Sequence, residues 1–208
     1  MDREACWRVI EQQRLAIADL LEDLSAQEWD APSLCAGWRI RDVAAHIAMT
    51  PQAPGPWTML VEAVRARGSF HRLNHDIAVR HANRPGADLV AELRRHAASR
   101  KLPAVTSYRN VLADTLVHAQ DMAIPLRRTL PMPTEAAATA ATRVWTMGWP
   151  FHAKRRLAGF RLTATDTTWT AGNGTEIRGP TSALLLLLTG RTESLRQLSG
   201  EGLAVLPK

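Results

Sequence analysis

The sequence predicts a mainly α-helical protein in which a helical bundle over residues 1–158 is followed by a small α+β module over residues 159–208. Apolar residues recur at helical spacing in successive segments up to about residue 157. From residue 160 on, short alternating segments and paired glycines replace that periodicity. We therefore place the boundary between two domains near residue 158.

The first part contains clear start and stop signals for helices. Ser25 and Glu28 form a capping-box pattern, which predicts the start of a short helix. Pro51 and Pro125 each follow an apolar-periodic segment and end it. The longer helices that we expect cover 4–24, 39–48, 57–67, 70–82, 87–100, 107–124 and 134–147, and a further short one ends at 157.

The last part of the chain reads as strands followed by helices. We expect strands over 160–165, 167–171 and 176–178, with Gly172-Asn173-Gly174 forming a hairpin turn between the second and the third. Pro180 predicts the start of an apolar helix over 181–189, which Gly190 ends. A short helix over 192–198 and a closing strand over 203–206 complete the prediction.

Charge and cysteine content narrow the class of protein. The chain has 26 basic and 20 acidic residues, a net charge of +6, and its basic residues are scattered. This favours a mildly basic solvated surface, with nucleic-acid binding as the minor alternative. The two cysteines, Cys6 and Cys35, allow neither a disulfide framework nor a four-cysteine zinc site.

The sequence gives no indication of a signal peptide or of a membrane-spanning segment. Acidic residues at Asp2, Glu4 and Glu11 do not fit a signal peptide, and the apolar run 183–188 is too short to span a bilayer. We therefore expect a cytoplasmic protein that makes no membrane contact.

A candidate metal site arises from two residues one helical turn apart. Asp114 and His118 share a face of the helix over 107–124, and His46, in an apolar context on an earlier helix, is the natural third ligand. Two histidines and a carboxylate leave coordination positions open, as catalytic zinc sites do, and nickel or iron accepts the same donors. The alternatives are that Asp114 only orients His118, or that both are solvated.

Several stretches together resemble the mycothiol-dependent maleylpyruvate isomerase-like family, within the DinB-like superfamily of helical bundles. The most specific is the Gly-Trp-x-x-Arg-Asp-Val-x-x-His string over 37–46. The resemblance covers most of the chain and is weakest over 51–105. The stretches that carry it are 24–30, 32–38, 41–46, 117–121, 125–126, 161–166 and 178–191.

The resemblance implies a DinB-like four-helix bundle that binds a divalent metal, followed by a small α+β C-terminal module. The family's ligands are a histidine on the second helix and a carboxylate and a histidine four residues apart on the third. They map onto His46, Asp114 and His118. The family's carboxylate is a glutamate, so Asp114 is one methylene shorter. Zinc is the expected metal, with nickel or iron as alternatives.

The resemblance also implies that mycothiol is the thiol cosubstrate. The function expected is a transferase or an isomerase in which a metal-activated thiolate attacks a small electrophile. A retained thiol gives a conjugate, and a thiol that leaves after bond rotation gives an isomer. The sequence identifies neither the catalytic nor the cosubstrate-binding residues, and it leaves a homodimer open.

The alternative is a non-catalytic, metal- or small-ligand-binding or regulatory member of the same fold. The shorter Asp114 motivates this alternative, together with a tail that resembles sterol-carrier-like folds.

Two further acidic residues lie one turn from the candidate histidines. Asp42 precedes His46 by four residues and Asp121 follows His118 by three. Each can orient its imidazole by a hydrogen bond, or can cap a helix or pair with an arginine, and Asp42 is also an alternative metal ligand. We expect the capping or pairing role for both.

The two cysteines are expected to be structural, and two arginines are candidates for substrate binding. Cys35 is a candidate nucleophile, but no histidine lies near it in the sequence, so we favour a buried apolar residue. Cys6, on the first helix, is likewise expected in the core. Arg72 and Arg80 are candidates to face an anionic substrate.

Overall fold

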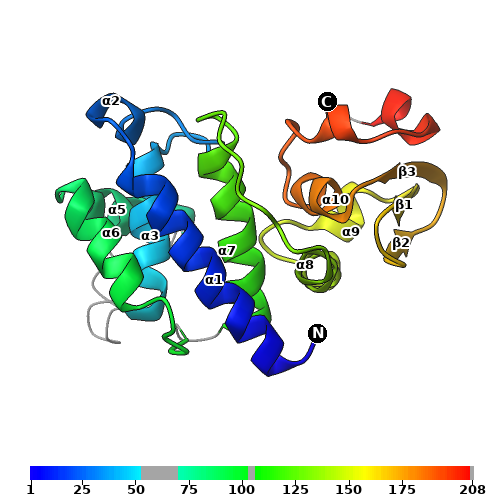
Figure 1. Cartoon of the computed structure of the whole chain (residues 1–208). Coiled ribbons are helices and arrows are strands. Elements are labelled where there is room, and N and C mark those ends of the chain that lie inside the picture. The colour runs from blue at the N-terminus through cyan, green and yellow to red at the C-terminus, as the bar shows by residue number, and fades with distance from the viewer. Residues whose placement is uncertain (53–69, 103–105, 207–208) are drawn as a thin grey trace.

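The structure, a computed structural model, describes residues 1–52, 70–102 and 106–206 (Figure 1). Most of this part of the chain is helical, which confirms the predicted fold class. The helix predicted over 57–67 lies outside the described residues. No described helix combines the length and the apolar character needed to cross a membrane. The helices are α1 (Arg3–Glu22), α2 (Ala26–Trp29), α3 (Ile40–Met49), α5 (Phe70–Ala82), α6 (Gly86–Arg95), α7 (Tyr108–Ala123), α8 (Thr134–Thr146), α9 (Ala153–Arg156) and α10 (Thr181–Leu188), with short 3₁₀ turns η1 (Thr50–Gln52), η2 (Leu195–Gln197) and η3 (Glu201–Val205).

The capping signals of the sequence act as predicted. The backbone N–H of Glu28 donates to Ser25 Oγ, and the Glu28 carboxylate accepts from the backbone N–H of Ser25 at 2.9 Å. Both bonds satisfy backbone donors that the first turn of α2 leaves without a helical partner. Helix α6 is shorter than predicted and ends at Arg95.

Helices α1, α3, α6 and α7 pack around one apolar core. Helix α1 lies along both α6 and α7, and α3 contacts α5, α6 and α7 (Figure 1). Removing the apolar faces of these helices from water is the main driving force for their association. Large side chains that become fully buried in this way include Ile17, Leu21, Ile40, Ile47, Leu89, Leu93 and Met122.

A second core joins the bundle to the C-terminal part of the chain. Helix α10 packs on α8, and its leucines share one apolar cluster with Ile10 of α1 and Leu116 of α7. This cluster runs across residue 158, so the domain boundary there stays a prediction. The shared core fixes the segment that follows α10 beside α7.

The sheet differs from its prediction. It consists of β1 (Phe160–Ala164), β2 (Thr170–Gly172) and β3 (Thr175–Gly179), in the order β2-β1-β3. Strand β1 pairs antiparallel with β2 and parallel with β3. The predicted hairpin between the second and third strands is therefore wrong, because these two strands lie on opposite sides of β1.

The glycines at 172 and 174 explain this outcome. Gly174 has φ 122°, and a β-carbon there would collide with the carbonyl oxygen of Gly159, which accepts a hydrogen bond from the backbone N–H of Thr175 at 3.0 Å. These glycines therefore reverse the chain, as predicted, but carry it closely past the start of β1 to the other side of that strand. The predicted turn is present, but packing against β1 decides on which side of β1 the following strand lies.

The closing strand predicted over 203–206 is also wrong. The chain forms η3 there, and the only strand-like pairing of the described C-terminal segment is a bridge between Ser199 and Arg178, with both backbone bonds at 2.8 Å. Gly200, at φ 111°, ends the pairing after this single bridge, and η3 then packs against β3.

We expect Gly174→Ala to destabilise the fold by about 2–4 kcal/mol, because it combines left-handed strain with a backbone collision. Gly159→Ala is the matched control: Gly159 also has a positive φ, 89°, but a β-carbon there meets open space. We expect Gly159→Ala to lower the free energy of unfolding by about 1–2 kcal/mol, from the positive φ alone. Urea unfolding of both variants measures the difference, and equal losses would contradict the collision.

Candidate metal centre

Helices α3 and α7 bring the three predicted ligands together. Asp114 Oδ2 lies 3.4 Å from Nε2 of His46, and Asp114 Oδ1 lies 3.4 Å from Nε2 of His118. The two imidazole rings meet edge to face, with centroids 5.0 Å apart. The spacing of Asp114 and His118 was visible in the sequence, whereas their approach to His46 depends on the packing of α3 on α7.

The donor separations suit a metal ion better than direct hydrogen bonds. Three donor atoms, one from each residue, lie within 4.8 Å of one another. Separations of 3.4 Å exceed the usual N–H···O length of about 2.9–3.0 Å. They match the spacing of about 3.3 Å between neighbouring ligands of a tetrahedral zinc ion with bonds of about 2.0–2.1 Å. The three side chains are 16–33% exposed, so a small ligand can reach this cluster.

The pKa values of Asp114 and His118 depend on the charges of their neighbours in the site. Burial opposes ionisation of Asp114, but the imidazoles of His46 and His118 outweigh it and hold the pKa of Asp114 far below its usual range. Burial likewise lowers the pKa of His118, but Asp114, and then Asp121, raise that pKa well above its usual value. Asp114 and His118 thus favour each other's charged forms, and a metal ion bound here would compete with the proton on His118.

Asp121 holds His118 in place. Its Oδ2 lies 2.8 Å from His118 Nδ1, which leaves Nε2 of that ring directed toward Asp114. The carboxylate also accepts from Arg191, from Nε at 2.9 Å and from Nη2 at 2.6 Å. Burial raises the pKa of Asp121, but the bonds from His118 and Arg191 outweigh this and hold it low. Asp121 therefore both orients His118 and pairs with an arginine, whereas the sequence analysis favoured only the second of these roles.

Asp42 has the capping and pairing role that was expected. It accepts from the backbone N–H of Arg39 at 2.8 Å and from the guanidinium of the same residue at 3.0 Å. Its carboxylate is therefore engaged at the start of α3. The ring of His46 instead packs edge to face with Trp38, with centroids 5.6 Å apart.

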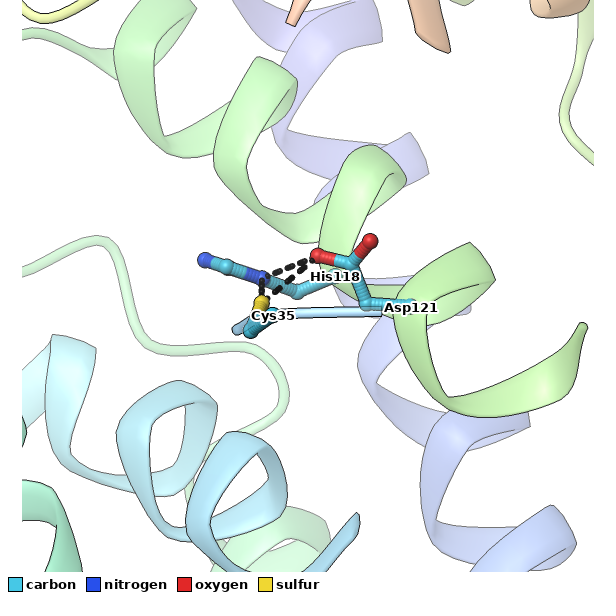
Figure 2. A group of neighbouring side chains, drawn as sticks. All are labelled: Cys35, His118 and Asp121. Atoms are coloured by element: carbon cyan, nitrogen blue, oxygen red, sulfur yellow. Dashed lines mark hydrogen bonds and ion pairs between the residues drawn. The ribbon is translucent and has the colours of Figure 1, made fainter. Parts of the chain in front are cut away.

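Cys35 is the residue that the sequence analysis placed wrongly. It is half-buried, and its Sγ lies 3.0 Å from Asp121 Oδ2 and 3.5 Å from His118 Nδ1 (Figure 2). The loop before α3 holds it there, because the backbone N–H of Leu34 donates to the carbonyl of Asp121 at 3.1 Å. No local pattern signals a contact across 83 residues. Cys6 is fully buried, as predicted.

The candidate ligands lie in a cavity of about 700 Å³. Residues of the bundle and of the C-terminal part both line this cavity, so neither part encloses it alone. Arg72 is part of this wall, as the sequence suggested, whereas Arg80 is not among the described lining residues. The described lining consists of Leu34, Cys35, Ala36, Trp38, His46, Arg72, His75, Asp114, His118, Trp149, Pro150, Phe151, Thr189, Gly190 and Arg191.

In metal-free protein, we expect the NMR titration midpoint of His118 to lie above the ordinary value of about 6.5. Asp114→Asn lowers this midpoint, because it removes the largest influence that raises the pKa. The raised pKa also means that protonated His118 stabilises the fold fully below about pH 6.5 and loses this effect as pH rises through the folded-state value.

Glu92→Gln is the control for this titration. Glu92 is a buried carboxylate on α6 that binds His81 and Arg84. We expect the His118 midpoint to stay unchanged in this variant. A midpoint that Asp114→Asn does not move would contradict the electrostatic account.

Comparison with known proteins relates part of this chain to a known family and its fold to two solved structures. Residues 10–105 match the family described as the mycothiol maleylpyruvate isomerase N-terminal domain. Among curated proteins, no sequence matches the chain. Two solved structures have a similar fold: the mycothiol-dependent maleylpyruvate isomerase (TM-score 0.67, 15% identity) and its variant with one histidine replaced by alanine (0.66, 14%). Each similarity covers 97% of this chain and 94% of the other. The family match therefore covers residues 10–105, in agreement with the resemblance seen in the sequence motifs, and the fold of the two solved structures extends over nearly the whole chain.

Proposed function

We propose that this protein is a metal- and mycothiol-dependent isomerase, in which His46, Asp114 and His118 hold the metal. The observation that carries the proposal is the convergence of these donors, with 3.4 Å separations, in the wall of a cavity. The family of residues 10–105 supports mycothiol as the cosubstrate, and the two similar structures, both of an isomerase, favour isomerisation over transfer.

The donor set fits zinc. Two imidazoles and one carboxylate that leave a position open are the ligands of many catalytic zinc sites, and nickel and iron accept them too. A bound zinc ion lowers the pKa of a thiol that coordinates it, so that the thiolate is available near neutral pH. Asp114 reaches both imidazoles despite its shorter side chain, which speaks against the non-catalytic alternative.

The chain's own residues have separate tasks in this proposal. Asp121 keeps the ring of His118 in its orientation and tautomer, with Nε2 toward the metal position. Arg72 supplies positive charge at the cavity wall, where a carboxylate of the substrate can bind. The aromatic rings of Trp38, Trp149 and Phe151 cover other parts of the wall and limit the access of water.

The reaction that follows from this arrangement starts with addition of the thiol to a double bond conjugated with a carbonyl group. The adduct has a single bond where the double bond was, and rotation about it followed by loss of the thiol gives the other isomer. The thiol is regenerated, so atoms balance without a further reactant. Retention of the thiol would give a conjugate, which is the transferase outcome.

The direct experiment is an assay of zinc-loaded protein with mycothiol and maleylpyruvate, together with His118→Ala. We expect isomerisation that requires mycothiol, and loss of both bound metal and activity in the variant. A His118→Ala protein with full activity would overturn the proposed mechanism. A thiol conjugate as the only product would replace isomerisation with transfer.

We expect Asp121→Asn to weaken zinc binding by about 10–100-fold, the usual effect of losing the partner that orients a histidine ligand. Competition with a chromogenic chelator measures this affinity. Glu92→Gln, which removes a buried carboxylate on α6, leaves it unchanged. Equal affinities in the native protein and in Asp121→Asn would show that His118 needs no such support.

A further inference from the structure

We propose that a second cavity of this protein binds a small organic anion, a molecule in which a carboxylate or phosphate group is joined to a flat apolar body. The cavity has a volume of about 270 Å³ and shares no described lining residue with the cavity of the candidate metal centre. This site lies outside the proposed reaction, so it does not depend on the proposed function. Its described lining consists of Trp145, Thr146, Met147, Gly148, His152, Lys154 and Arg155.

The lining of this second cavity has an excess of positive charge. Lys154 and Arg155 are exposed, and the titratable side chain of His152 is half-buried beside them. Within the described part of the chain, none of these three side chains makes a hydrogen bond or an ion pair, and the described lining includes no acidic residue. Because hydrogen bonds from cationic groups to an oxyanion are stronger than neutral ones, this lining favours a carboxylate or phosphate group.

The backbone around His152 holds the cationic groups in place. His152 has a left-handed conformation, with φ 46° and ψ 35°, which is uncommon for a residue with a side chain. Its N–H donates to the carbonyl of Gly148 at 2.6 Å, and its own carbonyl accepts from the N–H of Arg155 at 3.0 Å. These bonds fix the strained residue relative to Arg155. The two side chains therefore start from a backbone that needs no rearrangement when an anion binds.

The lining also provides apolar surface for the body of the ligand. Trp145, near the end of α8, and Met147, directly after that helix, both line the cavity, and the Trp145 ring offers a flat apolar face. The Thr146 hydroxyl donates to the carbonyl of Thr142 at 2.9 Å and is thus already engaged. The volume lies just below the range of about 300–1,000 Å³ that is typical of sites for drug-sized molecules. A small organic anion therefore fits better than a large cofactor.

The second cavity lies next to the wall of the first. Gly148 and His152 line the second cavity, whereas the residues between them, 149–151, line the cavity of the candidate metal centre. A single segment thus takes part in both walls. A ligand in the second cavity contacts this segment directly, which gives the site a route by which it can influence the first cavity.

The test titrates phenyl phosphate and benzoate into the full-length protein and follows the NMR signals of the His152 ring and the Trp145 indole. We expect saturable shifts of both signals, and the probe that binds more tightly identifies the anionic group of the ligand. Inorganic phosphate, which has no ring, binds more weakly than phenyl phosphate. Benzyl alcohol, which has no charge, binds at least about tenfold more weakly, because it forms no charged hydrogen bond.

A pair of charge-matched variants tests whether the two cations act specifically. We expect Lys154→Gln/Arg155→Gln to weaken binding of phenyl phosphate at least about tenfold, because it removes both exposed cations of the lining. The control, Arg95→Gln/Lys101→Gln, removes the same charges from exposed positions at the end of α6 and just after it, on the side of the molecule opposite α9 (Figure 1). We expect the control to bind with unchanged affinity.

Three outcomes would overturn the proposed site. The first is the absence of saturable shifts at His152 and Trp145 with either probe at up to about 10 mM, beyond the millimolar range of weak ligands. The second is equal affinity of the native protein and the Lys154→Gln/Arg155→Gln variant. The third is binding of benzyl alcohol as tight as that of phenyl phosphate. Metal content and isomerase activity are measured separately and bear only on the proposed function.

Discussion

The buried carboxylate of Asp121 is the point on which the geometry of the site depends. It binds His118 on one side and the guanidinium of Arg191 on the other. A carboxylate that is fully buried is costly unless its charge is compensated, and these two partners compensate it. His118 comes from α7 and Arg191 follows α10, so one residue connects the ligand helix to the C-terminal part.

This connection makes the C-terminal part a component of the site. Its attachment does not rest on Arg191 alone, because α10 packs on α8 within an apolar core that also includes α1 and α7. The core determines where the chain emerges at Thr189 and Gly190, in the cavity wall. Burial of the leucines of α10 thus stabilises the C-terminal part against the bundle. Arg191 is thereby placed where it binds Asp121, which orients the candidate ligand His118.

The sequence predicted those features that depend on neighbours along the chain. The capping box at Ser25 and Glu28 and the shared helical face of Asp114 and His118 are of this kind. His46 was proposed as the third ligand from its apolar context, and the family resemblance supported it, although no local pattern encodes its distance from the other two. Together these gave the helical fold and the three candidate ligands.

Features set by long-range packing escaped the sequence analysis. The glycines at 172 and 174 signalled a turn, but only packing against the start of β1 decides that the chain crosses it. Cys35 likewise showed no reactive partner nearby in the sequence, because His118 and Arg191 reach it from 83 and 156 residues away.

The most direct test of the central claim is anomalous diffraction from crystals of the protein grown with zinc. The account predicts one strong zinc peak, about 2.0–2.1 Å from Nε2 of His46, from Nε2 of His118 and from an oxygen of Asp114. The same peak should be absent from crystals of His46→Ala. A zinc ion bound between Cys35 and Asp121, or no ordered zinc near His46, would contradict the account.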